Sequence, residues 1–185
     1  MAVFASGSGS NFQAIQEAIL RGELHASIEL VVTDRPGAYV VTRAKNLGIP
    51  VLELAPKSFA SKALYEQAIV EALKSHEVEW VILAGYMRLV GDVLLSAYEG
   101  HIINIHPSLL PSFPGKDAVL QAVTHGVKVT GVTVHFVDAG MDTGPIIAQR
   151  AVDVVEGNLE ETEAHIHAIE HELYTSTLKQ LFEKK

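Results

Sequence analysis

Two hydrogen-bonding side chains that could take part in chemistry lie at the end of a predicted strand. The β-branched residues Ile102, Ile103 and Ile105 predict the strand, and Asn104 and His106 interrupt them at every second position. Side chains alternate between the two faces of a strand, so Asn104 and His106 should project from one face, about 7 Å apart. At the carboxyl end of a strand in an open α/β sheet, this pair could donate hydrogen bonds to a reacting group or move a proton.

The segment that follows predicts a tight loop. Pro107, Pro111 and Pro114 stop any regular hydrogen-bonded ladder, and Gly115 ends the loop. Because the loop is tight, Pro111 is a candidate for a cis peptide bond. An Asn and a His at a strand end can also be satisfied structural groups that stabilise such a turn, and these residues alone leave that alternative open.

A second candidate site opens the chain. A short apolar strand at 3–5 runs into the loop at 6–11, Ser-Gly-Ser-Gly-Ser-Asn, and a helix follows. This arrangement leaves backbone N–H groups at the helix start that can bind an anion, helped by the helix dipole. The pattern matches neither the dinucleotide fingerprint nor the lysine-bearing P-loop, so a mononucleotide phosphate is the better match. A plain tight turn is the structural alternative.

Both segments belong to an alternation of strands and helices. The alternation predicts an α/β fold with right-handed crossovers: a three-layer, mostly parallel twisted sheet of about seven strands with helices on both faces. The predicted strands are 3–5, 28–33, 51–54, 80–84, 102–106, 128–136 and 145–152; helices follow residue 11, span about 38–47, 61–75, 91–98 and 117–125, and follow a capping box at Asn158 and Glu161. In the helix at 61–75 the expected apolar face is Leu64, Ala68, Ile69, Ala72 and Leu73.

The composition limits the class of protein. The length of 185 residues fits a single domain, 1–185. A formal net charge of −8 argues against nucleic-acid binding, which needs clustered Lys and Arg. The absence of cysteine removes disulfides, a thiolate nucleophile and Cys-based metal sites. No signal-peptide pattern or membrane-length apolar run is present, so a cytoplasmic protein without membrane contact is expected, and a homodimer is left open.

These motifs resemble those of the phosphoribosylglycinamide formyltransferases, within the wider family of folate-dependent formyltransferases. The likeness covers essentially the whole chain. Its most specific parts are Asn-Ile-His-Pro-Ser-Leu-Leu-Pro at 104–111 and, further along, Met-Asp-Thr-Gly-Pro at 141–145. The loop at 6–11 narrows the likeness to members that accept a nucleotide, and the segments at 84–88 and 170–171 agree with it.

The resemblance implies transfer of a formyl group from 10-formyltetrahydrofolate to the amine of glycinamide ribonucleotide, in de novo purine (IMP) biosynthesis. It implies Asn104, His106 and Asp142 as the catalytic centre. Asn104 would donate to the oxyanion, protonated His106 would add a charge-assisted donor, and Asp142 would favour the imidazolium and hold a proton-shuttling water. His135, with Thr133 on the same strand face, could support this centre without touching substrate.

The binding residues are also implied by the resemblance. The mononucleotide-binding half, about 1–100, would hold the phosphate through Gly9, Ser10 and Asn11, and Glu170 would bind the ribose hydroxyls. Lys62 and Arg88 would contact the folate, although both could be ordinary solvated charges. The second half of the chain, about 101–185, would be the folate-binding and catalytic half. Residues from both halves would line the folate pocket: Lys62, Met87, Arg88, Leu89, Val90, Asn104, Val137, Asp138, Ala139, Gly140, Met141 and Asp142. No metal is implied.

The chain departs from the common pattern of this family at three places. Asp34 stands where Asn is more usual, and Thr175 follows Tyr174 where Pro is frequent. The first strand is also shorter than usual. None of these departures touches the proposed catalytic residues.

Other functions stay open. Methionyl-tRNA formyltransferases need a basic face and a further tRNA-binding domain, and formyltetrahydrofolate deformylases carry a further N-terminal domain; neither domain is expected in this chain. A catalytically silent nucleotide- or folate-binding module would show a damaged Asn/His/Asp trio, which is intact here. His167 and His171, at i, i+4 on the last helix, have a spacing that can bind zinc, but a polar helix face near the substrate is the preferred interpretation. His25, His101 and His125 resemble surface residues.

Overall fold

The computed structural model describes residues 1–184, and the chain groups into two compact units, Met1–Asn104 and Ile105–Lys185. Unit 1 contains β1 (Ala2–Phe4), α1 (Ser10–Leu20), β2 (Leu30–Thr33), α2 (Tyr39–Asn46), β3 (Val51–Glu53), the 3-10 helix η1 (Pro56–Ser58), α3 (Lys62–Ser75), β4 (Val81–Leu83) and α4 (Asp92–Ala97). Strand β5 (Ile102–His106) leads into unit 2, which continues with α5 (Ala118–His125), β6 (Val129–Phe136), β7 (Ile146–Asp153) and α6 (Leu159–Glu183).

The strands form the expected seven-stranded, mostly parallel sheet. Their order is β3-β2-β1-β4-β5-β6-β7. Strand β1 pairs in parallel with β2 and β4, so that Val3 lies between Val31 and Ile82. Strands β6 and β7 form an antiparallel pair with a register shift between Val134 and His135. The strand ends differ slightly from the predicted ranges and the short 3-10 helix η1 was not predicted, while the order and type of the predicted strands and α-helices agree with the structure within residues 1–184.

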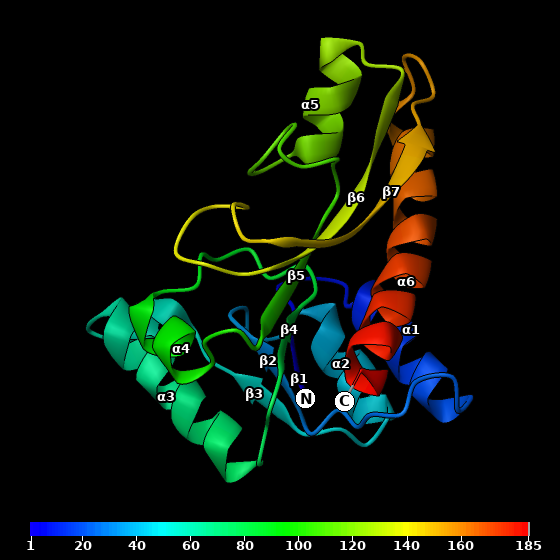
Figure 1. Cartoon of the computed structure of the whole chain (residues 1–185). Coiled ribbons are helices and arrows are strands. Elements are labelled where there is room, and N and C mark those ends of the chain that lie inside the picture. The colour runs from blue at the N-terminus through cyan, green and yellow to red at the C-terminus, as the bar shows by residue number, and fades with distance from the viewer. Residues whose placement is uncertain (185) are drawn as a thin grey trace. The chain divides into compact units, whose positions relative to one another are not determined.

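In unit 1 the parallel strands are buried on both faces. Every residue of β1, β2 and β4 is buried. This is why these strands read as continuous apolar runs instead of alternating patterns. Figure 1 shows α3 and α4 on one side of these strands and α1 and α2 on the other.

One prediction about the core of unit 1 is wrong. Leu64 was expected on the buried face of α3 but is 54% exposed. The buried stripe of α3 contains Tyr65, Ile69 and Leu73, which recur at every fourth position. Successive helical residues are about 100° apart, so Leu64 is turned away from that stripe.

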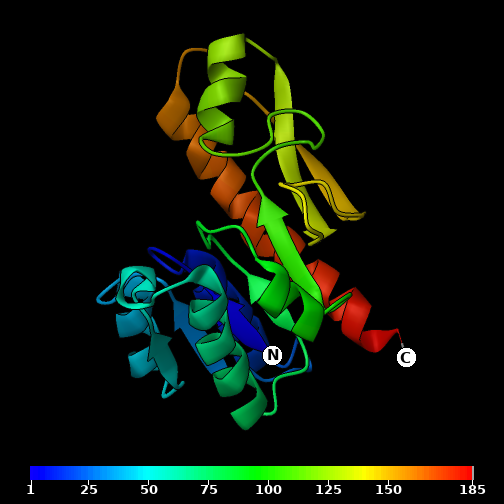
Figure 2. The same cartoon turned by 90° about the vertical axis from the view of Figure 1, so that its left-hand side faces the viewer.

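In unit 2, α6 begins at the predicted capping box. The side chain of Asn158 accepts the N–H of Glu161 at 3.0 Å and donates to the Glu161 carboxylate at 3.3 Å. The helix then continues without interruption through Tyr174 and Thr175, where the family pattern often has Pro. It packs against β6 and β7 (Figure 2).

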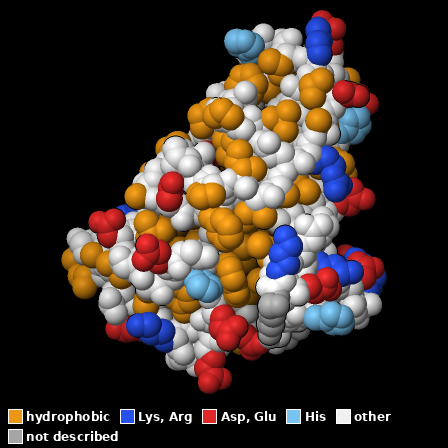
Figure 3. All heavy atoms as spheres, viewed as in Figure 1, with side chains coloured by type: hydrophobic (Ala, Val, Ile, Leu, Met, Phe, Trp, Pro, Cys, Tyr) orange, Lys and Arg blue, Asp and Glu red, His pale blue; other side chains and the backbone are white. Residues whose placement is uncertain are grey.

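The surface of unit 2 carries exposed apolar side chains. Leu120 on α5, Val129 on β6 and Ile146 on β7 are 46%, 48% and 49% exposed. Figure 3 shows hydrophobic side chains spread over the part of this face that carries α5 and β6. Within residues 1–184, no helix combines the length and the apolar character needed to cross a bilayer.

A buried carboxylate on α3 closes the start of α4. Glu66 is 3% exposed, and its oxygens accept the N–H of Gly91 at 2.7 Å and of Leu94 at 3.3 Å. The first N–H groups of a helix have no partner within the helix, and a carboxylate there also suits the helix dipole. Glu66 therefore anchors the end of the loop that precedes α4.

We expect Glu66→Ala to lower the free energy of unfolding by about 1–3 kcal/mol, because buried donors lose their acceptor. Urea denaturation measures this change. Glu71→Ala is the matched control, since Glu71 is exposed on the same helix, and its effect should stay within about 0.5 kcal/mol. Equal losses in the two variants would contradict the capping role of Glu66.

Candidate active site

Asp142 lies between two imidazoles in unit 2. Its Oδ2 accepts the backbone N–H of Gly115 at 2.8 Å and lies 3.5 Å from Nδ1 of His106. Its Oδ1 lies 3.8 Å from Nε2 of His135. The side chains of Asp142, His106 and His135 are 12%, 7% and 3% exposed. One short hydrogen bond thus fixes an enclosed carboxylate beside His106, where it can orient the imidazole and hold a water that carries a proton.

Both ring nitrogens of His106 face oxygen atoms. Nε2 lies 2.9 Å from the carbonyl oxygen of Phe113, and Nδ1 faces Asp142. A carbonyl oxygen only accepts, so Nε2 carries a proton and donates it to this bond. A neutral imidazole then presents the lone pair of Nδ1 toward the carboxylate, whereas a protonated one can donate from both nitrogens. Nδ1 is therefore the nitrogen available for proton exchange.

Asn104 lies on β5, two residues before His106. It pairs with Leu83 of β4 in the parallel register, and it is half-buried between the buried residues Ile103 and Ile105. The alternation along a strand places the amide of Asn104 and the imidazole of His106 on one face. The end of β5 therefore supplies both side chains that sequence analysis singled out.

Thr133 on β6 fixes the loop that follows His106. Its hydroxyl donates to the carbonyl of Ser108 at 2.7 Å and accepts the N–H of Leu110 at 3.1 Å. The side-chain amide of Gln149 also donates to it, at 3.0 Å. The Leu110–Pro111 peptide bond is cis, as the tight loop suggested. Thr133 is fully buried and serves as a positioning residue for this loop.

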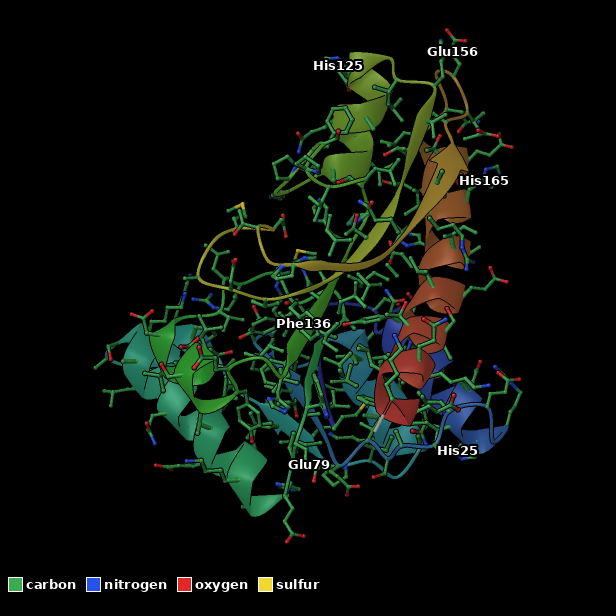
Figure 4. The ribbon with its side chains drawn as sticks, in the orientation of Figure 1. His25, Glu79, His125, Phe136, Glu156 and His165 are labelled. Carbon is green, nitrogen blue, oxygen red and sulfur yellow. The ribbon has the colours of Figure 1, made fainter. Side chains whose placement is uncertain are left out.

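The loop at 137–144 presents Asp142 in a left-handed conformation, with φ at 55°. It follows Phe136, which Figure 4 labels at the end of β6. Within the loop, Oδ1 of Asp138 accepts the hydroxyl of Thr143 at 2.7 Å and a backbone N–H at 3.0 Å, and these bonds lower the pKa of Asp138. A Cβ on Gly144 would overlap the carbonyl oxygen of Phe136, so this close approach requires glycine.

The rest of this loop is open to solvent. Val137 is half-buried, and Ala139, Gly140 and Met141 are exposed. Met141 exposes 52% of its surface. These residues are therefore accessible to solvent, and their role as a pocket wall stays a prediction.

The loop at 6–11 in unit 1 has the geometry of an anion-binding turn. Gly9 is the N-cap of α1 with φ at 77°, and its carbonyl accepts the N–H of Gln13 at 2.9 Å. Ser10 and Asn11 form the first turn of the helix. The first N–H groups of a helix point out of its N-terminus, where the helix dipole favours a negative charge.

The loop after β4 is tied to β1 and β2 by one hydroxyl. Ser6 accepts the N–H of Met87 at 2.8 Å and donates to Oδ1 of Asp34 at 2.6 Å. Ser6 and Asp34 are both buried. The hydroxyl of Ser6 needs only an oxygen acceptor, which either Asp or Asn supplies, so the departure at Asp34 keeps this contact.

Most of the side chains expected to meet folate in unit 1 face solvent. The guanidinium of Arg88 lies 5.7 Å from the centre of the Tyr65 ring. Burial raises the pKa of Tyr65 and of Tyr86, whose hydroxyls lie 2.9 Å apart. Met87 and Leu89 are 66% and 52% exposed, Arg88 and Lys62 are also exposed, and Val90 is half-buried.

Helix α6 carries the remaining candidate residues. Glu170 is 6% exposed, and its Oε1 lies 3.7 Å from Nδ1 of His167. His171 is half-buried on the same helix. Within residues 1–184, no group of three or more His, Asp and Glu side chains is placed to hold a metal ion.

The histidines expected at the surface are there. His25, His101 and His125 are exposed, as is His165 on α6. Figure 4 labels His125 at the end of α5 and His165 on α6, both at the periphery.

Sequence reasoning missed the groups that fix His106 and Asp142. These are the carbonyl of Phe113 and the N–H of Gly115, which belong to the backbone and carry no residue-type signal. The capping role of Glu66 was also missed, because a carboxylate in an amphipathic helix is usually predicted to be solvated. Only the glycine at the end of the proline-rich loop hinted at a backbone contact there.

Comparison with known proteins gives one consistent result. The family model described as formyl transferase matches residues 1–178. Among curated proteins, phosphoribosylglycinamide formyltransferase of Bacillus subtilis (strain 168) is 58% identical over 181 residues, which cover 97% of this chain and 93% of that protein.

Solved structures agree with the sequence comparison. The phosphoribosylglycinamide formyltransferase of Bacillus halodurans has a TM-score of 0.96 at 55% identity and covers 99% of this chain and 95% of its own. Glycinamide ribonucleotide transformylase 1 of Geobacillus kaustophilus has a TM-score of 0.95 at 58% identity, with coverages of 97% and 96%. The seven-stranded, mostly parallel fold is therefore shared with these enzymes.

The contact between His167 and Glu170 makes a prediction about protonation. The Glu170 carboxylate raises the pKa of His167, against the opposing effect of partial burial. An NMR titration should therefore place the midpoint of His167 above the ordinary value of about 6.5. The free energy that this contact contributes to folding should be fully present below the pKa that His167 has in the unfolded state. It should be lost as pH rises through the raised pKa of His167 in the folded state.

Removing the carboxylate charge tests the cause of this shift. Glu170→Gln should lower the midpoint of His167. Glu172→Gln is the control, because Glu172 lies on the same helix but pairs with Arg150 at 3.1 Å. A midpoint that is unchanged in Glu170→Gln would contradict the assignment.

Proposed function

Because the chain belongs to the formyl transferase family, we propose that it transfers a formyl group from 10-formyltetrahydrofolate to the amine of glycinamide ribonucleotide. The products are formylglycinamide ribonucleotide and tetrahydrofolate, in a step of de novo purine biosynthesis. The observation that carries the proposal is the likeness to the Bacillus subtilis phosphoribosylglycinamide formyltransferase along nearly the whole of both chains.

The reaction needs donors for the charge that develops on the formyl oxygen when the amine adds to the formyl carbon. We assign this role first to Asn104, whose side-chain amide donates without any change of charge. Donors aimed at a developing oxyanion lower the barrier because they require no reorganisation during the reaction. The half-buried position of Asn104 on β5 supports the assignment.

His106 and Asp142 take the proton-handling roles. His106 is held by the Phe113 carbonyl through Nε2, which leaves Nδ1, when protonated, as a second donor. Asp142 is held by the Gly115 N–H through Oδ2, its Oδ1 lies 3.8 Å from Nε2 of His135, and we assign the carboxylate to hold a water. The new carbon–nitrogen bond forms, the bond to the folate nitrogen breaks, and this water carries the proton from the new ammonium to that nitrogen.

Other residues bind the substrates. Gly9, Ser10 and Asn11 hold the nucleotide phosphate through the start of α1, and Glu170 accepts the ribose hydroxyls. The folate contacts are the exposed residues 87–89, with Val90, Lys62 and the loop 137–142. His135 and Thr133 position Asp142 and the loop after His106. The proposed reaction uses no metal.

Three further properties are part of the proposal. The chain acts as a single formyltransferase domain, 1–185, on small-molecule substrates. We infer a cytoplasmic location. A homodimer is an option that sedimentation of the purified protein would decide.

The experiment that tests the function is formyl transfer in vitro. Purified protein receives 10-formyltetrahydrofolate with or without glycinamide ribonucleotide, and the release of tetrahydrofolate is followed. Release that depends on the nucleotide is the expected result. Release without it would indicate a deformylase, and binding without release would indicate a module that has lost the chemistry.

We expect Asn104→Ala to reduce turnover by a hundredfold or more, since one oxyanion donor contributes about 3–4 kcal/mol to the barrier. Steady-state kinetics measure the loss. Asn46→Ala, at the exposed end of α2, is the control and should retain the parent rate. If Asn104→Ala stayed within a few-fold of the parent, Asn104 would have only a positioning role.

A further inference from the structure

Helix α2 holds the backbone of the loop at 7–9 in unit 1. The N–H of Val40 donates to the carbonyl of Gly7 at 3.0 Å. The Nε of Arg43 donates to the carbonyl of Ser8 at 2.8 Å, and a terminal nitrogen of its guanidinium lies 3.4 Å from the Ser8 hydroxyl. Both carbonyls therefore point toward α2.

The next carbonyl of the loop is also occupied. Gly9 accepts the N–H of Gln13 as the first hydrogen bond of α1. A Cβ on Gly9 would lie 2.5 Å from Cγ2 of Val40, so the loop lies against α2 with no room for a side chain. Three successive carbonyl oxygens are thus taken up by α1 and α2.

The direction of these carbonyls fixes the direction of the neighbouring N–H groups. In a trans peptide the C=O and the N–H point in opposite directions. With the carbonyls of Gly7 and Ser8 turned toward α2, the N–H groups of Ser8 and Gly9 point away from it. Successive N–H groups beside a helix N-terminus form a concave site for an anion, because no carbonyl oxygen there repels it.

We propose that Arg43 is a positioning residue for the phosphate of the nucleotide substrate. Its guanidinium holds the carbonyl of Ser8 away from the phosphate and so keeps the N–H of Gly9 turned toward it. This inference rests on the proposed function, which supplies the nucleotide. Arg43 acts through the Ser8–Gly9 peptide and does not have to touch the substrate.

The surroundings of Arg43 restrict its conformational freedom, as this role requires. It is half-buried, and its guanidinium carbon lies 4.9 Å from the centre of the Tyr39 ring. A planar guanidinium that is held against a ring loses little further freedom when it donates two hydrogen bonds to one residue. Its positive charge beside the loop also favours an anion.

A purely structural role for Arg43 makes a different prediction. Arg43 lies in the last turn of α2, where any positive charge stabilises the carboxyl end of the helix. Lys45 lies in the same turn and is exposed. Lys45→Met therefore removes the same charge from the same turn and is the matched control for Arg43→Met.

The test compares the two variants with the parent protein in steady-state kinetics and thermal unfolding. In Arg43→Met we expect the KM for glycinamide ribonucleotide to rise about tenfold, the size of the effect of losing one hydrogen bond to a charged group. The KM for 10-formyltetrahydrofolate and the Tm should match those of Lys45→Met. Arg43→Lys should lie between Arg43→Met and the parent.

Two outcomes would overturn the proposal. A nucleotide KM in Arg43→Met equal to that in Lys45→Met would leave Arg43 as a helix-end charge, and a parallel rise of both KM values would indicate a general structural loss. If Arg43→Met fails to fold, Arg43→Lys decides: a raised nucleotide KM at unchanged Tm supports the proposal, and a parent KM contradicts it.

A second measurement separates this proposal from the proposed function. Inorganic phosphate is titrated into each protein while the backbone amide shifts of Ser8, Gly9 and Ser10 are followed by NMR. If the parent shows no formyl transfer, the proposed function fails, but the role of Arg43 is still decided. The proposal is supported if the amides shift in the parent and the same shifts require about a tenfold higher phosphate concentration in Arg43→Met. Equal phosphate concentrations at the midpoint in the two proteins, or no shifts in the parent, would overturn it.

Discussion

The hydrogen bond between the N–H of Gly115 and the carboxylate of Asp142 is the contact on which the proposed catalytic cluster depends. It joins two segments that are 27 residues apart, and it fixes the carboxylate at 3.5 Å from the imidazole of His106. Asp142 adopts a left-handed φ, which costs a non-glycine residue on the order of 1 kcal/mol and persists only where the surroundings hold it. The turn built by Asp138 and Thr143 supplies that support.

Unit 1 uses the same physical principle on its loops. A loop has no hydrogen-bonded ladder of its own, so its backbone groups need partners from side chains or neighbouring elements. Ser6 accepts the N–H of Met87, Glu66 accepts that of Gly91, and Arg43 donates to the carbonyl of Ser8. In each case a buried or half-buried side chain fixes a backbone group in a loop proposed to face a ligand or at the end of such a loop. In the loop after β4, the side chains of Met87, Arg88 and Leu89 stay exposed.

Much of the fold was predictable because local patterns and burial agree. Continuous apolar runs identified the buried strands β1, β2 and β4, and the capping box at Asn158 identified the start of α6. The error at Leu64 arose because apolar residues can be assigned to two adjacent stripes of a short helix, and only packing decides which stripe is buried. The contact of Thr133 with Ser108 and Leu110 could not be predicted, since it joins residues more than twenty positions apart.

The sequence by itself determined nearly all of the elements that form, and it contains the side chains to which we assign the chemistry. Periodicity, glycine and proline positions, and the Asn104, His106 and Asp142 residue types are properties of the chain that hold before it folds. Only the tertiary structure decided that Asp142 meets His106 and that the Phe113 carbonyl fixes the imidazole. It also decided that Arg43 donates a hydrogen bond to the Ser8 carbonyl. These contacts use backbone groups or distant segments, and their formation depends on the packing of the whole unit, which no local pattern encodes.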